Sequence, residues 1–220
     1  MSTWCNNDKN GFVNSSINNL GQINTNTMFG NLIKKYAEDE KYLTYLEIGT
    51  WNGMGSTKCF KEGFDNRKDK NYQFYSLECN KDKSLYAKQF YKNDQNIHIL
   101  NEVIYNIDME EIYKVFPILK NDEMYNGWHK IDIENMKNCN LFFERKDIPE
   151  FFDIVLLDGG EFTTYFEFKA IENKCKILML DDTNTFKCHK ILEEITSNPD
   201  KWKILFKMDE RNGFMIAEKL

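Results

Sequence analysis

Two stretches of the chain are almost entirely apolar, and they indicate strands that are buried on both faces. They are Phe151–Asp158 and Cys175–Leu180. Such strands are typical of parallel sheets covered by helices on both sides. Three more segments, short and rich in aromatic and branched residues, are also expected to be strands: 42–48, 72–78 and 97–104.

Segments with helical spacing alternate with these strands. Phe29, Leu32 and Ile33 illustrate the spacing that places apolar side chains on one helix face. Helices are expected at 29–36, 56–64, 84–92, 109–116, 164–172 and 188–195, and a terminal hairpin at 202–208 and 213–218. The alternation predicts an α/β fold, with a Rossmann-like, doubly wound, mostly parallel seven-stranded sheet that ends in a C-terminal antiparallel hairpin. Thr164 and Glu167 have the spacing of a capping box.

The pattern divides the chain into a polar arm and one domain. Residues 1–26 contain eight Asn and no apolar core, which also argues against a signal peptide. Residues 27–220 form the expected domain, and its stretch 105–150 is too long for a simple loop and indicates a lid or insertion. We expect the choice of acceptor to depend on this arm and on the insertion.

Composition excludes several classes of protein. The 220 residues carry 29 Lys+Arg against 35 Asp+Glu, a net charge of −6, which disfavours nonspecific nucleic-acid binding. The densest basic stretch, Arg67–Lys70, is interpreted as a solvated loop. None of the six cysteines forms a Cys-x-x-Cys pair, so we expect reduced thiols and a cytoplasmic protein. No apolar run approaches the roughly 20 residues of a membrane span.

Acidic residues and glycines end several of the expected strands. The first strand runs into Glu47–Gly55, the second ends at Glu78, the fourth at Asp158 and the fifth at Asp181 and Asp182. Ligands of open α/β sheets bind beyond these carboxyl ends. The glycine pattern E-x-G-x-x-x-G-x-G differs from that of dinucleotide sites, and its leading acid disfavours a phosphate. A ligand with an ammonium, a sulfonium and a ribose fits better, with the ribose hydroxyls on the carboxylate of Glu78.

The segment Glu47–Thr57, the acid that ends the second strand and the terminal hairpin together resemble the class I S-adenosylmethionine (SAM)-dependent methyltransferases. The resemblance covers about residues 42–220. It is closest to the subgroup of small-molecule and sugar O-methyltransferases of the macrocin and aminocoumarin type, with their cephalosporin-hydroxylase-like relatives. It implies that these residues bind the cofactor: Glu47, Gly49, Thr50, Trp51, Gly53, Gly55, Ser56, Glu78, Cys79, Asn101, Glu102, Val103 and Asp158.

The same resemblance implies a magnesium site and a catalytic base. Some of these relatives bind Mg²⁺ with one Asp after the fourth strand and two after the fifth, which correspond here to Asp158, Asp181 and Asp182. The relatives place an acid two residues after the first ligand, where this chain has Gly160. Glu161 follows one position later and is the candidate base, so the expected catalytic residues are Asp158 and Glu161.

We therefore expect O-methylation of a small hydroxylated acceptor, such as a sugar or glycan precursor, with SAM as cofactor and Mg²⁺ as an optional one. The alternative is a non-catalytic accessory subunit with the methyltransferase fold. A dinucleotide oxidoreductase is disfavoured by the glycine spacing, and an RNA methyltransferase by the net charge. Purely structural roles are the alternatives for several of these residues. Asp181 and Asp182 would then cap the following helix, Asp158 would stabilise a turn, and Trp128 and His129 would belong to a small local core. The acceptor's identity and a homo-oligomeric state are left open by the sequence.

Overall fold

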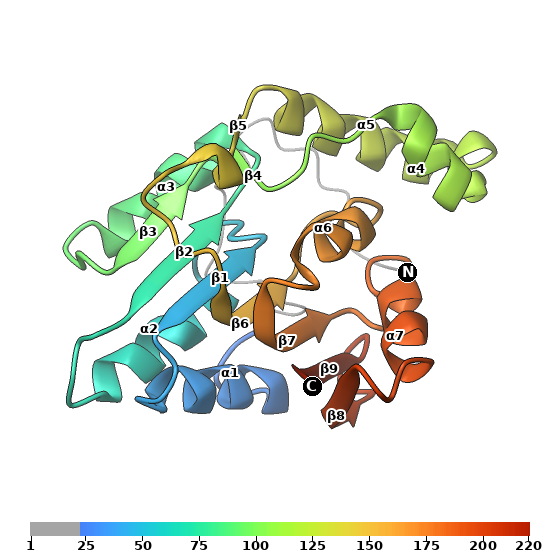
Figure 1. The fold of residues 1–220 in the computed structure, drawn as a ribbon. Coiled ribbons are helices and arrows are strands. Elements are labelled where there is room, and N and C mark those ends of the chain that lie inside the picture. The colour runs from blue at the N-terminus through green and yellow to red at the C-terminus, as the bar shows by residue number, and fades with distance from the viewer. Residues whose placement is uncertain (1–22) are drawn as a thin grey trace.

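A computed structural model describes residues 23–220, so most of the polar arm lies outside the described residues. Its centre is a seven-stranded sheet with the order β3-β2-β1-β6-β7-β9-β8 (Figure 1). Five strands are parallel, and β9 is antiparallel to both β7 and β8. The strands are β1 (Thr44–Ile48), β2 (Gln73–Leu77), β3 (Ile97–Leu100), β6 (Phe152–Leu157), β7 (Cys175–Asp181), β8 (Trp202–Met208) and β9 (Phe214–Lys219). The predicted sheet with its terminal hairpin is confirmed.

Helices cover both faces of this sheet, as the apolar runs predicted. One face packs against α1 (Met28–Glu38), α2 (Ser56–Asn66) and α3 (Lys81–Tyr91). The other packs against α6 (Thr164–Ile171) and α7 (His189–Thr196). Within β1, Tyr45 belongs to the first core and Leu46 to the second, because successive strand residues point to opposite faces. Burial on both faces explains the lack of alternation in β6 and β7.

The insertion folds into short elements of its own. They are β4 (Glu102–Val103), α4 (Met109–Val115), the 3₁₀ turn η1 (Pro117–Lys120), α5 (Glu123–Lys137), β5 (Asn140–Leu141) and the 3₁₀ turn η2 (Phe142–Glu144). In Figure 1, α4 and α5 lie together above the sheet. Ile112, Phe116 and Ile133 form a third core with Phe162 and Phe166, and this core anchors the insertion to α6 and the loop before it.

The length of one strand and the cap of one helix differ from the sequence predictions. The predicted strand 97–104 is too long, because the chain leaves the main sheet after Leu100 and β4 pairs with β5 in a separate two-stranded sheet. The predicted capping box of Thr164 and Glu167 is also wrong. Thr163 is the N-cap residue of α6 and makes no side-chain cap bond, while the hydroxyl of Thr164 donates to the carbonyl of Gly160 at 2.8 Å.

Arg67 is buried, which corrects the interpretation of Arg67–Lys70 as a solvated loop. Its guanidinium donates to the carbonyl of Tyr42 at 2.8 Å and to the Tyr45 hydroxyl at 3.2 Å, and it lies 2.9 Å from the Asp69 carboxylate. These bonds join the loop after α2 to the start of β1. Hydrogen bonds can stabilise such loop junctions because they replace the water that burial removes.

We expect Arg67→Met to lower the free energy of unfolding by about 2 kcal/mol, because it strips a charged donor from buried acceptors. Urea unfolding followed by circular dichroism measures this change. The exposed neighbour Lys68 supplies the control, since Lys68→Met should change stability by no more than about 0.5 kcal/mol. Equal effects of the two substitutions would show that the Arg67 bonds contribute nothing.

Candidate active site

A cleft opens at the carboxyl ends of β1, β2, β6 and β7, where the sequence places its acidic residues and glycines. Most of the predicted site residues line it: Gly49, Thr50, Trp51, Gly55, Ser56, Glu78, Cys79, Glu102, Val103, Asp158, Asp181 and Asp182. Four others do not: Glu47, Gly53, Asn101 and Glu161. The fold thus gathers residues from four strand ends around one space.

The glycine loop after β1 needs glycine at two positions. Gly49 has a φ of +102° and Gly53 a φ of +76°, which side-chain-bearing residues rarely adopt. A Cβ on Gly49 would lie 2.0 Å from the carbonyl oxygen of Asp158, so the loops after β1 and β6 touch through their backbones. The amides of Gly49 and Thr50 both donate to the carbonyl of Leu77, at 2.9 and 3.1 Å, which ties the loop to β2.

Glu47 lies behind this loop and has no exposed surface. Its carboxylate accepts hydrogen bonds from the hydroxyls of Ser56, Thr57 and Ser76. The hydroxyls of Ser76 and Thr50 are also hydrogen-bonded to each other. Burial raises the pKa of Glu47 to about 7, although the three hydroxyls oppose this shift. The geometry therefore gives Glu47 a supporting position under the cleft wall.

Glu78 stands at the tip of β2 and faces the loop. One carboxylate oxygen accepts from the backbone amide of Trp51 at 2.7 Å, and the other accepts from that of Asn80 at 2.8 Å. Burial raises its pKa, which is the usual effect of a low-dielectric site on a carboxyl group. The side chain of Asn101 donates to the carbonyls of Glu78 and Cys79, at 2.8 and 3.0 Å. Asn101 thus braces the β2 tip from outside the cleft.

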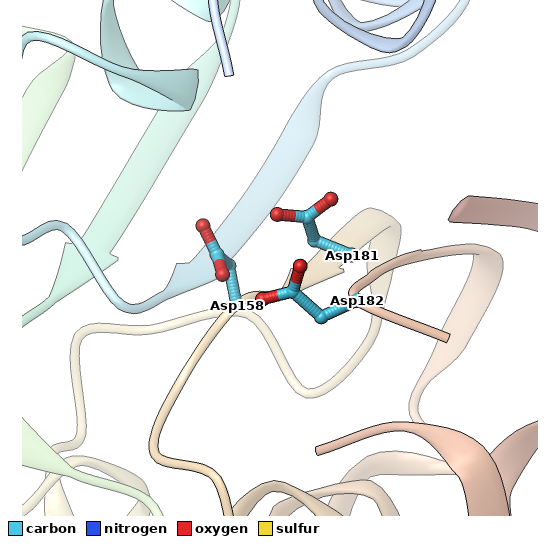
Figure 2. A group of neighbouring side chains, drawn as sticks. All are labelled: Asp158, Asp181 and Asp182. Atoms are coloured by element: carbon cyan, nitrogen blue, oxygen red, sulfur yellow. The ribbon is translucent and has the colours of Figure 1, made fainter. Parts of the chain in front are cut away.

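Three carboxylates gather at the ends of β6 and β7, as Figure 2 shows for Asp158, Asp181 and Asp182. One oxygen from each lies within 4.8 Å of the others. Two cations already contact them: the Lys187 ammonium is 2.7 Å from both Asp158 and Asp182, and Arg211 is 3.2 Å from Asp181. The oxygen donors suit Mg²⁺ in kind, but this arrangement does not fit a bound ion, because Lys187 holds two of the three carboxylates.

Electrostatics in this cluster follow from burial and from Lys187. Burial raises the pKa of Asp158 and of Asp181. Burial would also raise the pKa of Asp182, but Lys187, the Asn212 amide and Arg211 together outweigh it and hold that pKa below its usual range. Burial works against the charge of Lys187, yet the three carboxylates keep its pKa well above the ordinary value. Lys187 and Asp182 therefore stay charged near neutral pH, whereas burial and the neighbouring Asp158 and Asp182 raise the pKa of Asp181 to about 8.

Glu161, the candidate base, accepts a hydrogen bond from the backbone amide of Lys187 at 3.3 Å. It does not line the cleft. Trp128 and His129 do not line it either. His129 is fully buried and makes edge contacts with Tyr113 and Phe162, so the local-core interpretation describes it.

Other lining residues were not identified from the sequence. Asp132 and Met136 come from α5, Glu167 from α6, Lys187 from the loop after β7, Lys83 from α3, and Ile23 from the end of the predicted arm. A Cβ on Gly159 would lie 2.6 Å from a carboxylate oxygen of Glu167, and one on Gly160 would lie 2.7 Å from that of Asp132. These two carboxyl groups thus pack directly over the glycine pair. Burial raises their pKa values, to about 6 for Asp132 and about 8 for Glu167.

Several solved structures that share the fold are methyltransferases. An O-methyltransferase from Bacillus cereus, in complex with SAH, gives a TM-score of 0.54 at 12% identity over 87% of this chain and 80% of that one. SAH-bound PaMTH1 from Podospora anserina gives 0.52 at 12% identity, over 87% and 77%. A putative caffeoyl-CoA O-methyltransferase from Staphylococcus aureus gives 0.52 at 14% identity, over 88% and 84%. The fold is that of the class I methyltransferases.

Sequence comparisons add nothing to this structural likeness. No protein-family profile matches the chain, and no curated protein matches it significantly. Within residues 23–220, no helix combines the length and the apolar character required to cross a bilayer.

Proposed function

We propose that this protein is a SAM-dependent O-methyltransferase that acts on a small hydroxylated acceptor, such as a sugar or glycan precursor. The observation that carries the proposal is the position of Glu78. Its carboxylate accepts a hydrogen bond from the Trp51 amide, 2.7 Å away, at the point where the glycine loop meets the tip of β2 in the cleft. A ribose with two neighbouring hydroxyls needs such a two-oxygen acceptor. The shared fold with SAH-bound methyltransferases supports the same cofactor.

In this proposal the three parts of the cofactor lie along the cleft. The methionine part lies against the loop from Gly49 to Ser56, the ribose lies on Glu78, and the adenine lies beside Glu102 and Val103. Glu47, Gly53 and Asn101 act indirectly, by holding the loop and the β2 tip. The sulfonium methyl then points toward the carboxylates at the ends of β6 and β7.

The chemistry is an in-line transfer. The acceptor oxygen forms a bond to the methyl carbon while the carbon–sulfur bond breaks, with its electron pair moving to sulfur, and the hydroxyl proton leaves to a base. We assign the base to Asp132. Asp158 is paired with Lys187 and Glu161 holds the Lys187 amide, whereas Asp132 lines the cleft over Gly160 and has a pKa raised by burial to about 6. A base with a pKa near the working pH is the most effective.

Other predictions from the sequence stay predictions. No step of this mechanism passes through Mg²⁺, because Lys187 holds two of its expected ligands. A cytoplasmic location, a homo-oligomeric state and the division into arm, domain and insertion also remain predictions. An accessory subunit would bind SAM without turnover, so release of S-adenosylhomocysteine with any hydroxylated acceptor separates it from an enzyme.

Calorimetry should show saturable binding of SAM to the wild type, and Glu78→Gln should weaken it by at least about tenfold, since a charged hydrogen-bond acceptor contributes about 1.5–3 kcal/mol. Glu134→Gln, on the exposed face of α5, is the matched control and should leave the affinity unchanged. If the Glu78 variant binds SAM as tightly as the wild type, Glu78 does not bind the ribose. If the wild type does not bind SAM, the proposed function is refuted.

Asp132→Asn should reduce turnover by about 100-fold, the range expected for loss of a positioned base. The affinity for SAM should change by less than about twofold, because the substitution preserves size and removes only the proton acceptor. The rate of S-adenosylhomocysteine release with an acceptor found by screening hydroxylated compounds gives the measurement. A normal rate in the Asp132 variant would show that Asp132 is not the base. Glu161→Gln in the same assay tests Glu161, the base predicted from the sequence.

A further inference from the structure

Lys187 lies where a divalent cation would have to bind. Its ammonium is 2.7 Å from Oδ1 of Asp158 and 2.7 Å from Oδ2 of Asp182. Only 12% of its side chain is exposed, and it lines the cleft. An ammonium at hydrogen-bonding distance from two carboxylates is held more tightly than a surface lysine, because little water competes for it.

The backbone around Lys187 fixes this position. Asp182 has a φ of +54°, and its carbonyl accepts bonds from the amide and the hydroxyl of Thr185, both at 3.1 Å, in a tight turn. The Lys187 amide then donates to the Thr185 hydroxyl at 3.2 Å and to Oε1 of Glu161 at 3.3 Å. The turn and Glu161 together aim the lysine back toward the strand ends. Glu161 is thus a positioning residue for Lys187.

The chain's own cations offset most of the negative charge of this cluster without a metal. The three carboxylates carry three negative charges when ionised, and Lys187 and Arg211 supply two positive charges. One divalent ion would supply the same two charges. Arg211 reaches Asp181 from the turn between β8 and β9, and Asn212 of the same turn donates to Asp182 at 3.0 Å. Buried carboxylates require compensation of this kind, and here the chain itself provides it.

We propose that Lys187 is a built-in counter-cation that takes the place of a divalent metal at Asp158 and Asp182, so that the protein binds its cofactor and works without Mg²⁺. This inference rests on the proposed function, because it concerns the site next to the methyl group that would be transferred. It also predicts something independent of catalysis. Removing the ammonium should convert the same carboxylates into a metal site, because their oxygens are hard ligands and already lie within 4.8 Å of one another.

The test measures binding of Mn²⁺ alone, by electron paramagnetic resonance and calorimetry. The wild type should show no saturable site in the millimolar range, and SAM affinity should be the same with a chelator and with Mg²⁺. Lys187→Ala should bind Mn²⁺ at least tenfold more tightly than the wild type. The double variant Lys187→Ala with Asp158→Asn should bind Mn²⁺ no more tightly than the wild type. Lys190→Ala, a neighbouring lysine outside the cleft, should behave like the wild type.

Circular dichroism checks that each variant is folded. If the alanine variant is not, Lys187→Gln removes the charge, retains a hydrogen-bond donor and gives the same readout. The proposal is overturned if the wild type binds Mn²⁺ saturably and Asp158→Asn abolishes that binding, or if the folded Lys187 variants gain no affinity. Failure of the wild type to bind SAM would instead refute the proposed function and leave the Mn²⁺ result interpretable.

Discussion

Replacing Gly49 by alanine is expected to abolish SAM binding and to lower the free energy of unfolding by about 4 kcal/mol, the upper range for overpacking added to backbone strain. The added Cβ would lie 2.0 Å from the backbone oxygen of Asp158, and the residue would keep a φ of +102°. A backbone atom cannot rotate away as a side chain does. The loops after β1 and β6 must therefore separate, which displaces both walls of the cleft.

Gly127→Ala provides the matched control. Gly127 lies within α5, is exposed, and an added Cβ there would have no heavy atom within 4 Å. This substitution should stabilise the protein by about 0.5–1 kcal/mol, the advantage of alanine over glycine inside a helix. Urea unfolding measures both variants, and calorimetry with SAM measures the cleft. If Gly49→Ala unfolds like the wild type, the close approach of the two loops is not present in solution.

The sheet could be predicted from sequence because burial on both faces requires apolar residues at consecutive positions of a strand. After a single charged residue near its start, Asp153 in β6 and Lys176 in β7, each strand has only buried apolar side chains up to the acid that ends it. The terminal hairpin was recognisable for a related reason, since two strands flank a short polar turn. The length of β3 was not predictable, because Asn101 leaves the sheet to brace the β2 tip and only tertiary contacts decide that.

The insertion was harder to interpret because its longest helix has a weak pattern. The buried residues of α5 are His129, Ile133 and Met136, and the first of them does not read as apolar. Asp132 lies on the same helix and would be taken for a surface acid. Only the packing of α5 against α6 brings its carboxyl over Gly160.

The acids at the strand ends were predictable, and their partners were not. Acids that end parallel strands must lie at one edge of the sheet, so Glu78, Asp158 and Asp182 were found from strand positions alone. Lys187 comes from a loop, and its direction depends on the left-handed backbone of Asp182 and on the bond to Glu161. A sequence pattern carries no signal for such a geometry.

The buried carboxyl of Glu47 should make stability fall as pH rises. Its folded-state pKa is raised to about 7 from an ordinary value of 4.5, so the folded protein holds a proton that the unfolded chain has already released. The stabilising contribution is therefore complete below about pH 4.5 and is lost progressively as the pH rises to about 7. Over this range the loss amounts to about 3 kcal/mol by linkage.

Glu47→Gln should remove this dependence, because an amide does not titrate and can still bond to the hydroxyls of Ser56, Thr57 and Ser76, which rotate to donate or accept. The difference in unfolding free energy between variant and wild type should shift in favour of the variant by about 3 kcal/mol from pH 4.5 to pH 8. Other buried acids contribute equally to both proteins and cancel. Urea unfolding across this pH range measures the shift, with Glu134→Gln as the exposed control. A constant difference would mean that Glu47 is ionised at all these pH values, and that its three hydroxyl partners outweigh its burial.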